Sequence, residues 1–208
     1  MSKSKCVDVV FLLDRSGSMS GIEEDTIGGY NSYIDGELGK NVRVTTVLFD
    51  DQYELLTDRV PIKEVKKLTR KEYFVRGCTA LLDAVGKTIG KMDSEKCDKV
   101  IFIITTDGLE NASKEYNKAQ IKKMIKDHDK WEFMYIGANI DSYSEGASIG
   151  INKKNISNYR KDTEGVGKLF KAMGRATQMY CEDAEISDSW KDELEDYVKN
   201  TNDDENDW

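Results

Sequence analysis

Three oxygen-bearing side chains alternate along one short segment of the sequence: Asp14, Ser16 and Ser18. They directly follow the apolar run VVFLL at 9–13, which is typical of a buried strand. The carboxyl ends of strands are where open α/β sheets place their binding sites. One carboxylate and two hydroxyls, without sulfur or imidazole, favour a hard divalent cation such as Mg²⁺. The pattern therefore predicts a metal site at the end of the first strand.

Two further segments carry side chains that could complete this site. Thr79 adds a third hydroxyl in the segment GCTALLDAVG, and Asp107 follows the most apolar predicted strand in the segment TTDGLEN. If the strand order reverses between the first strand and the strand at 99–106, both strand ends lie beside one crevice. The candidate metal residues are therefore Asp14, Ser16, Ser18, Thr79 and Asp107.

The segments DRSGSM, GCTALLDAVG and TTDGLEN, in this order, resemble bacterial and phage forms of the von Willebrand factor type A (vWA) domain. The resemblance covers residues from about 5 to about 180, and it implies a metal-ion-dependent adhesion site (MIDAS). In that site Ser16, Ser18 and Thr79 would bind the metal directly, and Asp14 and Asp107 would act mainly through water. The implied cofactor is Mg²⁺, or Mn²⁺ or Ca²⁺ in its place. The implied partner is a protein whose Glu or Asp carboxylate replaces a metal-bound water.

The chain departs from the family pattern next to Thr79, where Cys78 precedes the threonine and Arg76 precedes Gly77. We expect Arg76 to be a solvated loop arginine and Cys78 to pack as a small residue under the metal site. The predicted helix that begins near Ala80 would direct its positive amino-terminal end toward an incoming anion.

The apolar periodicity predicts a Rossmann-like, doubly wound α/β sheet of about six strands, mostly parallel, with one antiparallel edge strand and helices on both faces. The expected strands are 5–13, 42–49, 53–57, 99–106, 132–136 and 156–159. The expected helices are 22–38, weakened by Gly28-Gly29, and 81–92, 114–128, 141–149 and 163–180.

The charge is unevenly distributed along the chain. Residues 182–208 contain 12 acidic and 2 basic residues, which leaves 27 acidic and 29 basic residues in the remainder. We therefore predict a vWA domain at 1–181 and an acidic extension at 182–208. In the extension Trp190, Leu194 and Tyr197 indicate a short helix at 187–200, with Ser189 as its cap, before a disordered tail. One hypothesis is that the tail carboxylates compete for the cation.

Other compositional features limit the class of protein. The sequence shows no apolar window of membrane-spanning length and no secretory signal, and its four cysteines form no CxxC pair. We therefore expect a cytoplasmic protein with reduced thiols that does not bind a membrane. No Lys/Arg cluster suggests nucleic-acid binding, and a monomer is the default expectation.

Two other functional interpretations stay open beside a non-catalytic binding module. A metal-dependent hydrolase or phosphatase could use the same crevice, although Ser16 stands where dehalogenase-type phosphatases have their second Asp. His128, the only histidine, is expected in a solvated loop at the opposite edge of the sheet, so it offers such an enzyme no proton carrier. The second alternative is an accessory subunit of an ATPase complex. We expect no enzymatic activity.

Overall fold

The computed structural model describes residues 6–94, 99–182 and 185–205. They form one six-stranded sheet with the order β3-β2-β1-β4-β5-β6, in which only the β2–β3 pair is antiparallel. This confirms the predicted doubly wound sheet and its antiparallel edge strand. The strands are β1 (Val7–Asp14), β2 (Val42–Phe49), β3 (Tyr53–Pro61), β4 (Val100–Thr106), β5 (Glu132–Gly137) and β6 (Ile156–Asn158).

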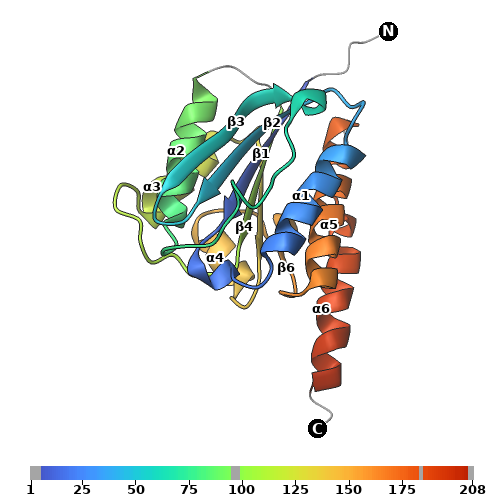
Figure 1. Cartoon of the computed structure of the whole chain (residues 1–208). Coiled ribbons are helices and arrows are strands. Elements are labelled where there is room, and N and C mark those ends of the chain that lie inside the picture. Colours follow the sequence, from blue (N-terminus) through green and yellow to red (C-terminus); the bar gives the residue numbers. More distant parts are fainter. Residues whose placement is uncertain (1–5, 95–98, 183–184, 206–208) are drawn as a thin grey trace.

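Helices cover both faces of the sheet (Figure 1). One face packs against α1 (Glu23–Gly36) and α5 (Thr163–Cys181), with α6 (Asp192–Glu205) beside α5. The other face packs against α2 (Leu81–Asp93), α3 (Lys118–Asp127) and α4 (Ser142–Ser148). Both cores arise from the alternation of β1, whose odd-numbered apolar residues face α1 and α5 and whose Val10 and Leu12 face α2.

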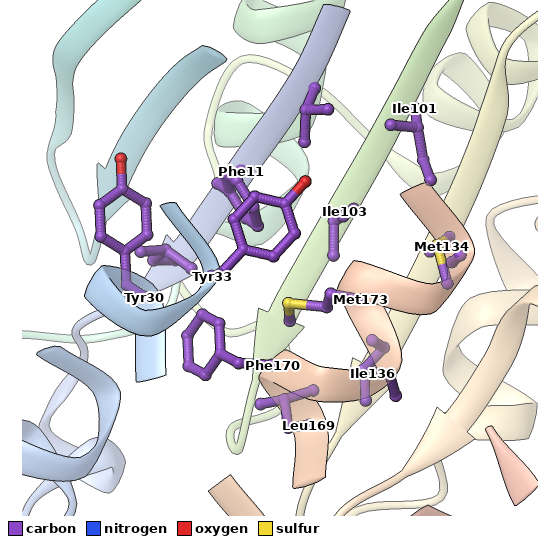
Figure 2. Packing of buried hydrophobic residues seen from close by; sticks show 14 of the residues in the cluster. Phe11, Tyr30, Tyr33, Ile101, Ile103, Met134, Ile136, Leu169, Phe170 and Met173 are labelled. Atoms are coloured by element: carbon purple, nitrogen blue, oxygen red, sulfur yellow. The ribbon is translucent and has the colours of Figure 1, made fainter. Parts of the chain in front are cut away.

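Aromatic side chains fill the core between the sheet and α1 (Figure 2). The ring of Phe11 on β1 meets Tyr30 and Tyr33 of α1 edge-on, at centroid distances of 5.6 and 4.8 Å. Phe170 of α5 packs so close to α1 that a Cβ on Gly29 would lie 2.1 Å from its Cδ2 atom. The Gly28-Gly29 pair that weakens the helical pattern therefore contains the residue that allows α1 and α5 to approach each other.

The segment after α5 belongs to the same core. Ile186, Trp190 and Leu194 are at most 1% exposed and join the cluster under α5. The Trp190 Nε1–H donates to the carbonyl of Lys154, and Lys191 Nζ donates to the carbonyl of Ile156 on β6 at 2.7 Å. This segment therefore covers the β6 edge of the sheet.

The predicted helix in the acidic extension exists, with different bounds. Asp188–Trp190 forms a 3₁₀ turn, so Ser189 is not the cap of α6, which begins at Asp192 and continues to Glu205. The division into a domain at 1–181 and an extension at 182–208 stays a prediction. Residues 206–208 of the expected disordered tail lie outside the described residues.

Two other element bounds differ from the predictions for local reasons. Helix α3 begins at Lys118 instead of 114, because the Asp83 carboxylate accepts hydrogen bonds from the amides of Lys114, Glu115 and Tyr116 and holds them as a loop. Asn117 and Gln120 then form a capping box. Strand β3 continues to Pro61, four residues beyond its expected end, along the free edge of the sheet.

The described residues contain three free cysteines, Cys6, Cys78 and Cys181, and Cys97 lies outside them. Within the same residues, no helix combines the length and the apolar character that a membrane crossing would require.

Candidate metal site

Three loops meet at the carboxyl edge of the sheet, where the strand order reverses between β1 and β4. The loop after β1 is tied to the loop before α2 by the hydrogen bond from the Gly17 amide to the Gly77 carbonyl, at 3.1 Å. The loop after β4 joins the same cluster because the Asn111 amide donates to the Thr79 carbonyl at 3.0 Å. The structure therefore brings together all three segments that the sequence singled out.

Asp14 is the last residue of β1, and its carboxylate is fully buried. The amide of Ser16 donates to Oδ1 at 2.7 Å and the hydroxyl of Thr106 donates to Oδ2 at 2.5 Å. Burial raises the pKa of Asp14 to about 6, and the charge of Asp107 adds to this rise, while the hydrogen bonds from Thr106 and Ser16 oppose it. The carboxylate is thus held rigidly at the site and lacks a cationic partner in the described structure.

The three predicted hydroxyl ligands converge on Gly108. A Cβ atom built on this glycine would lie 2.9 Å from Thr79 Oγ1, 3.0 Å from Ser18 Oγ and 3.8 Å from Ser16 Oγ. The two serine hydroxyls lie 3.0 Å apart. Three hydroxyl oxygens from two separate loops therefore surround one small region of space.

Asp107 follows β4 directly, and its side chain is 1% exposed. Its Oδ2 atom lies 2.9 Å from Lys161 Nζ. Its Oδ1 atom is buried and has no hydrogen-bond partner among the described residues. A buried carboxylate oxygen without a partner is costly unless water or a cation satisfies it.

The donor set fits a hard divalent cation. Three hydroxyls and two carboxylates supply oxygen atoms alone, which suits Mg²⁺, Mn²⁺ or Ca²⁺ better than a soft metal. The unpartnered Asp107 oxygen is an additional acceptor on the same side. Among the described residues, no group of three or more His, Cys, Asp or Glu side chains is arranged to hold a metal, so a site here depends on the hydroxyl oxygens.

Several residues at the site were not anticipated from the sequence. Thr106 fixes Asp14, Asn111 accepts a hydrogen bond from the Thr79 amide at 2.9 Å, and Lys161 pairs with Asp107. Thr106 and Asn111 both lie inside the motif TTDGLEN, so their closeness to Asp107 in the sequence could have indicated that they belong to the site. Lys161 lies far along the chain, and its spacing from the motif carries no such signal.

Arg15, inside the first motif, is fully buried and anchors the loop after β1. Its Nε lies 2.9 Å from Asp50 Oδ2, and its Nη1 lies 2.7 Å from Glu54 Oε2. Arg76 is a partly solvated loop arginine, with a side chain that is 37% exposed, and it also pairs with the same Asp50 oxygen at 2.7 Å. Burial opposes ionisation of Asp50, but hydrogen bonds from Arg76 and Gln52 and the charge of Arg15 hold its pKa below the usual value.

Two expectations about the loop before α2 are wrong. Cys78 is exposed instead of packed under the site, because the loop turns its side chain outward while Thr79 is buried. Helix α2 begins beside the site as expected, but the amides of Leu82 and Asp83 already bind Glu110 and Ser113. A carboxylate of the chain itself therefore compensates this helix end.

His128 is not in a solvated loop. It is the carboxyl-terminal cap of α3, and its side chain is 14% exposed. Its Nδ1 lies 2.6 Å from the Met124 carbonyl and its Nε2 lies 2.7 Å from Asp93 at the end of α2. Helices α2 and α3 run back from the carboxyl edge of the sheet, so this histidine lies at the opposite edge from Asp14 and Asp107.

Comparison with known structures identifies the fold. The von Willebrand factor domain of the type V pilus tip protein Mfa5 from Porphyromonas gingivalis matches with a TM-score of 0.65 at 11% identity, over 90% of this chain and 100% of that one. The ArnB paralog VWA2 from Sulfolobus acidocaldarius matches with a TM-score of 0.58 at 17% identity, over 83% of this chain and 45% of that one.

Proximal thread matrix protein 1 from the mussel byssus, in a structure with a zinc-occupied MIDAS motif, matches with a TM-score of 0.63 at 16% identity. The match covers 84% of this chain, which spans about half (46%) of the length of the mussel protein. The sequence matches no protein-family model and no curated protein. At these identities the likeness concerns the fold, and the chain therefore has the fold of a von Willebrand factor type A domain.

Proposed function

We propose that this vWA-fold protein binds a divalent cation at Asp14, Ser16, Ser18, Thr79 and Asp107, and that the bound cation captures a carboxylate of a protein partner. The observation that supports the proposal most directly is the convergence of three hydroxyls on Gly108 beside the unpartnered Oδ1 of Asp107. Helix capping, the other common role of Ser and Thr before helices, is not their role here. The cap of α2 is Ala80, and Ser16 makes no side-chain cap hydrogen bond.

Each residue has a distinct part in this function. Ser16, Ser18 and Thr79 would supply neutral oxygen ligands, while Asp14 and Asp107 would orient the waters of the ion. Neutral ligands leave a bound divalent ion strongly electrophilic, so an anionic oxygen from outside is favoured at an open coordination position. Thr106 and the Ser16 amide keep Asp14 in place for this task.

We further propose that the protein acts by binding and has no catalytic activity. Both oxygens of Asp14 accept hydrogen bonds, Asp107 pairs with Lys161, and His128 lies at the other edge of the sheet. In this proposal both carboxylates of the crevice serve the metal, and no histidine lies beside them among the described residues, which favours binding over hydrolysis. Zinc occupies the MIDAS of the mussel protein, which supports a divalent ion here without selecting Mg²⁺. The cytoplasmic location and the monomeric state stay predictions.

The first test is metal binding by calorimetry and thermal unfolding, with Mg²⁺ and Mn²⁺ added to protein treated with EDTA. A metal at 100 times its dissociation constant should stabilise the wild type by about 2.7 kcal/mol. Ser18→Ala and Thr79→Ala each remove one ligand and should weaken binding by roughly tenfold or more. Ser20→Ala is the matched control, since this exposed serine lies in the same loop outside the hydroxyl cluster.

Absence of any heat of binding or thermal shift in the wild type at millimolar metal would contradict the metal site. The partner chemistry is tested separately with a hexaglutamate peptide and a hexaglutamine peptide. We expect the wild type to bind only hexaglutamate, only in Mg²⁺ or Mn²⁺, and not after Thr79→Ala. Equal binding of both peptides, or binding that persists in EDTA, would contradict carboxylate capture by the metal.

A further inference from the structure

Lys161, in the loop between β6 and α5, reaches into the candidate metal site from outside the three motif segments. Its Nζ lies 2.9 Å from Oδ2 of Asp107 and donates a hydrogen bond to the carbonyl oxygen of Ser18. The Lys161 side chain is 19% exposed, whereas the Asp107 carboxylate is 1% exposed. One ammonium group thus contacts two of the five predicted metal residues, each from a different loop.

The charges at the site explain why the ammonium is held there. Asp14 and Asp107 place two buried carboxylates at the carboxyl ends of the neighbouring strands β1 and β4. Asp14 is satisfied by neutral donors, the Ser16 amide and the Thr106 hydroxyl. Among the ion pairs of the described residues, Lys161 is the cation that contacts this carboxylate pair, and its single charge offsets one of the two negative charges.

We propose that Lys161 competes with the divalent cation for Asp107 and thereby sets the metal affinity of the site. This inference rests on the proposed function. A divalent ion at the hydroxyl cluster and an ammonium bound to Asp107 repel each other at short range in a poorly hydrated site. Binding of the metal must overcome that repulsion or displace the Lys161 side chain from Asp107.

The surroundings allow such a displacement. Lys161 lines an open groove of about 590 Å³ together with Asn139, Asn158 and Arg160. A lysine side chain is flexible, with a charge at its end that remains well hydrated. The ammonium can therefore leave Asp107 for this groove without crossing the packed core.

The test compares metal affinities of variants that differ at this position, measured by calorimetry with Mn²⁺ and Mg²⁺ on EDTA-treated protein. Lys161→Met keeps the aliphatic length and removes the charge, so it should bind metal at least about tenfold more tightly than the wild type. Lys161→Arg keeps the charge, so its affinity should stay within about threefold of the wild-type value. Lys123→Met is the matched control, because it removes a lysine that is 76% exposed on α3.

A second readout separates competition from a general loss of structure. In EDTA, Lys161→Met should unfold at a lower temperature than the wild type, because Asp107 and the Ser18 carbonyl lose their partner. Addition of Mn²⁺ should then raise its unfolding temperature by more than it raises that of the wild type. Both effects should be absent in Lys123→Met.

The outcomes separate this inference from the proposed function. Metal binding by the wild type with equal or weaker binding by Lys161→Met would overturn the competition, and Lys161 would then be a residue that positions Asp107. Metal binding by Lys161→Met but not by the wild type would support the competition, since Lys161 would then exclude the metal completely. Binding by neither protein would overturn the proposed metal site, and the inference with it.

Discussion

The hydroxyl oxygens of Thr79 and Ser18 both lie close to residue 108, which has no side chain. Any Cβ there would lie 2.9 to 3.0 Å from both oxygens, closer than ordinary contact distances permit. At the scale of single residues, the candidate site therefore depends as much on Gly108 as on its five oxygen-bearing side chains. Arg15 and Asp50 have a comparable structural part, since their buried ion pair fixes the loop that carries Ser16.

Gly108→Ala should weaken Mn²⁺ binding by at least about tenfold, because the added methyl group would displace the Thr79 and Ser18 hydroxyls from their present positions. The measurement is calorimetric titration, with circular dichroism to confirm that the fold persists. Gly90→Ala is the control, since nothing lies within 4 Å of a Cβ at that exposed position of α2. Wild-type affinity in Gly108→Ala would show that the hydroxyl cluster does not bind the metal.

At the scale of elements, two carboxylates fix the segment between β4 and α3, one on α2 and one within the segment itself. Glu110 accepts hydrogen bonds from the amides of Leu82, Ala112 and Ser113, and Asp83 accepts three more from residues 114–116. The segment that carries Asp107 is thus attached to the first turn of α2. At the other ends of α2 and α3, the pair Asp93–His128 links the two helices.

This pair predicts a pH dependence of stability. Burial lowers the pKa of His128, but the Met124 carbonyl and Asp93 outweigh it, so the pKa is raised above its usual value. A raised pKa adds stability that is complete below the pKa of the unfolded chain and is lost as the pH rises through the folded value. His128→Gln should therefore cost up to about 1 kcal/mol at pH 5.5 and less at pH 8.5.

Urea unfolding at the two pH values measures this difference. Lys126→Gln, which removes another cation from the last turn of α3, should lower stability equally at both. An equal cost of His128→Gln at both pH values would show that its ionisation does not contribute.

At the scale of the whole molecule, the segment after α5 closes the sheet. Trp190 is fully buried, and Lys191 donates to the carbonyl of Ile156 on the edge strand β6. Helix α6 then runs along α5, and the Arg160 side chain, next to Lys161, donates to the carbonyl of Thr201 near its end. The acidic residues beyond Thr201 therefore follow a point that contacts the loop carrying Lys161.

Two truncations test this arrangement. The chain 1–201 should keep its free energy of unfolding within about 0.5 kcal/mol. The chain 1–181 should fail to fold, because loss of Trp190 alone removes a contribution of about 3–5 kcal/mol. Urea unfolding followed by circular dichroism distinguishes them, and equal midpoints would show that the segment is dispensable.

The chain 1–201 also tests the hypothesis that the tail carboxylates compete for the cation. If they do, 1–201 should bind hexaglutamate more tightly than the full chain.

The sequence by itself determined the order of strands and helices and the five candidate metal residues. Alternation and apolar runs report which face of an element is buried. Asp14 and Asp107 directly follow apolar runs, and the resemblance to vWA domains adds Thr79, which lies before a helix. These patterns involve residues that are close in the sequence, so they can be recognised without knowing the tertiary contacts.

The tertiary structure decided everything that depends on contacts between distant segments. Lys161 pairs with Asp107, which lies 54 positions earlier in the sequence, and Arg76 pairs with Asp50. Trp190 belongs to the hydrophobic core although its neighbours in the sequence are largely acidic. The bounds of α3 likewise depended on Asp83, a residue of another helix. These contacts depend on which side chains lie close together in the folded chain, because charge interactions and burial depend on distance in space and not on separation in the sequence.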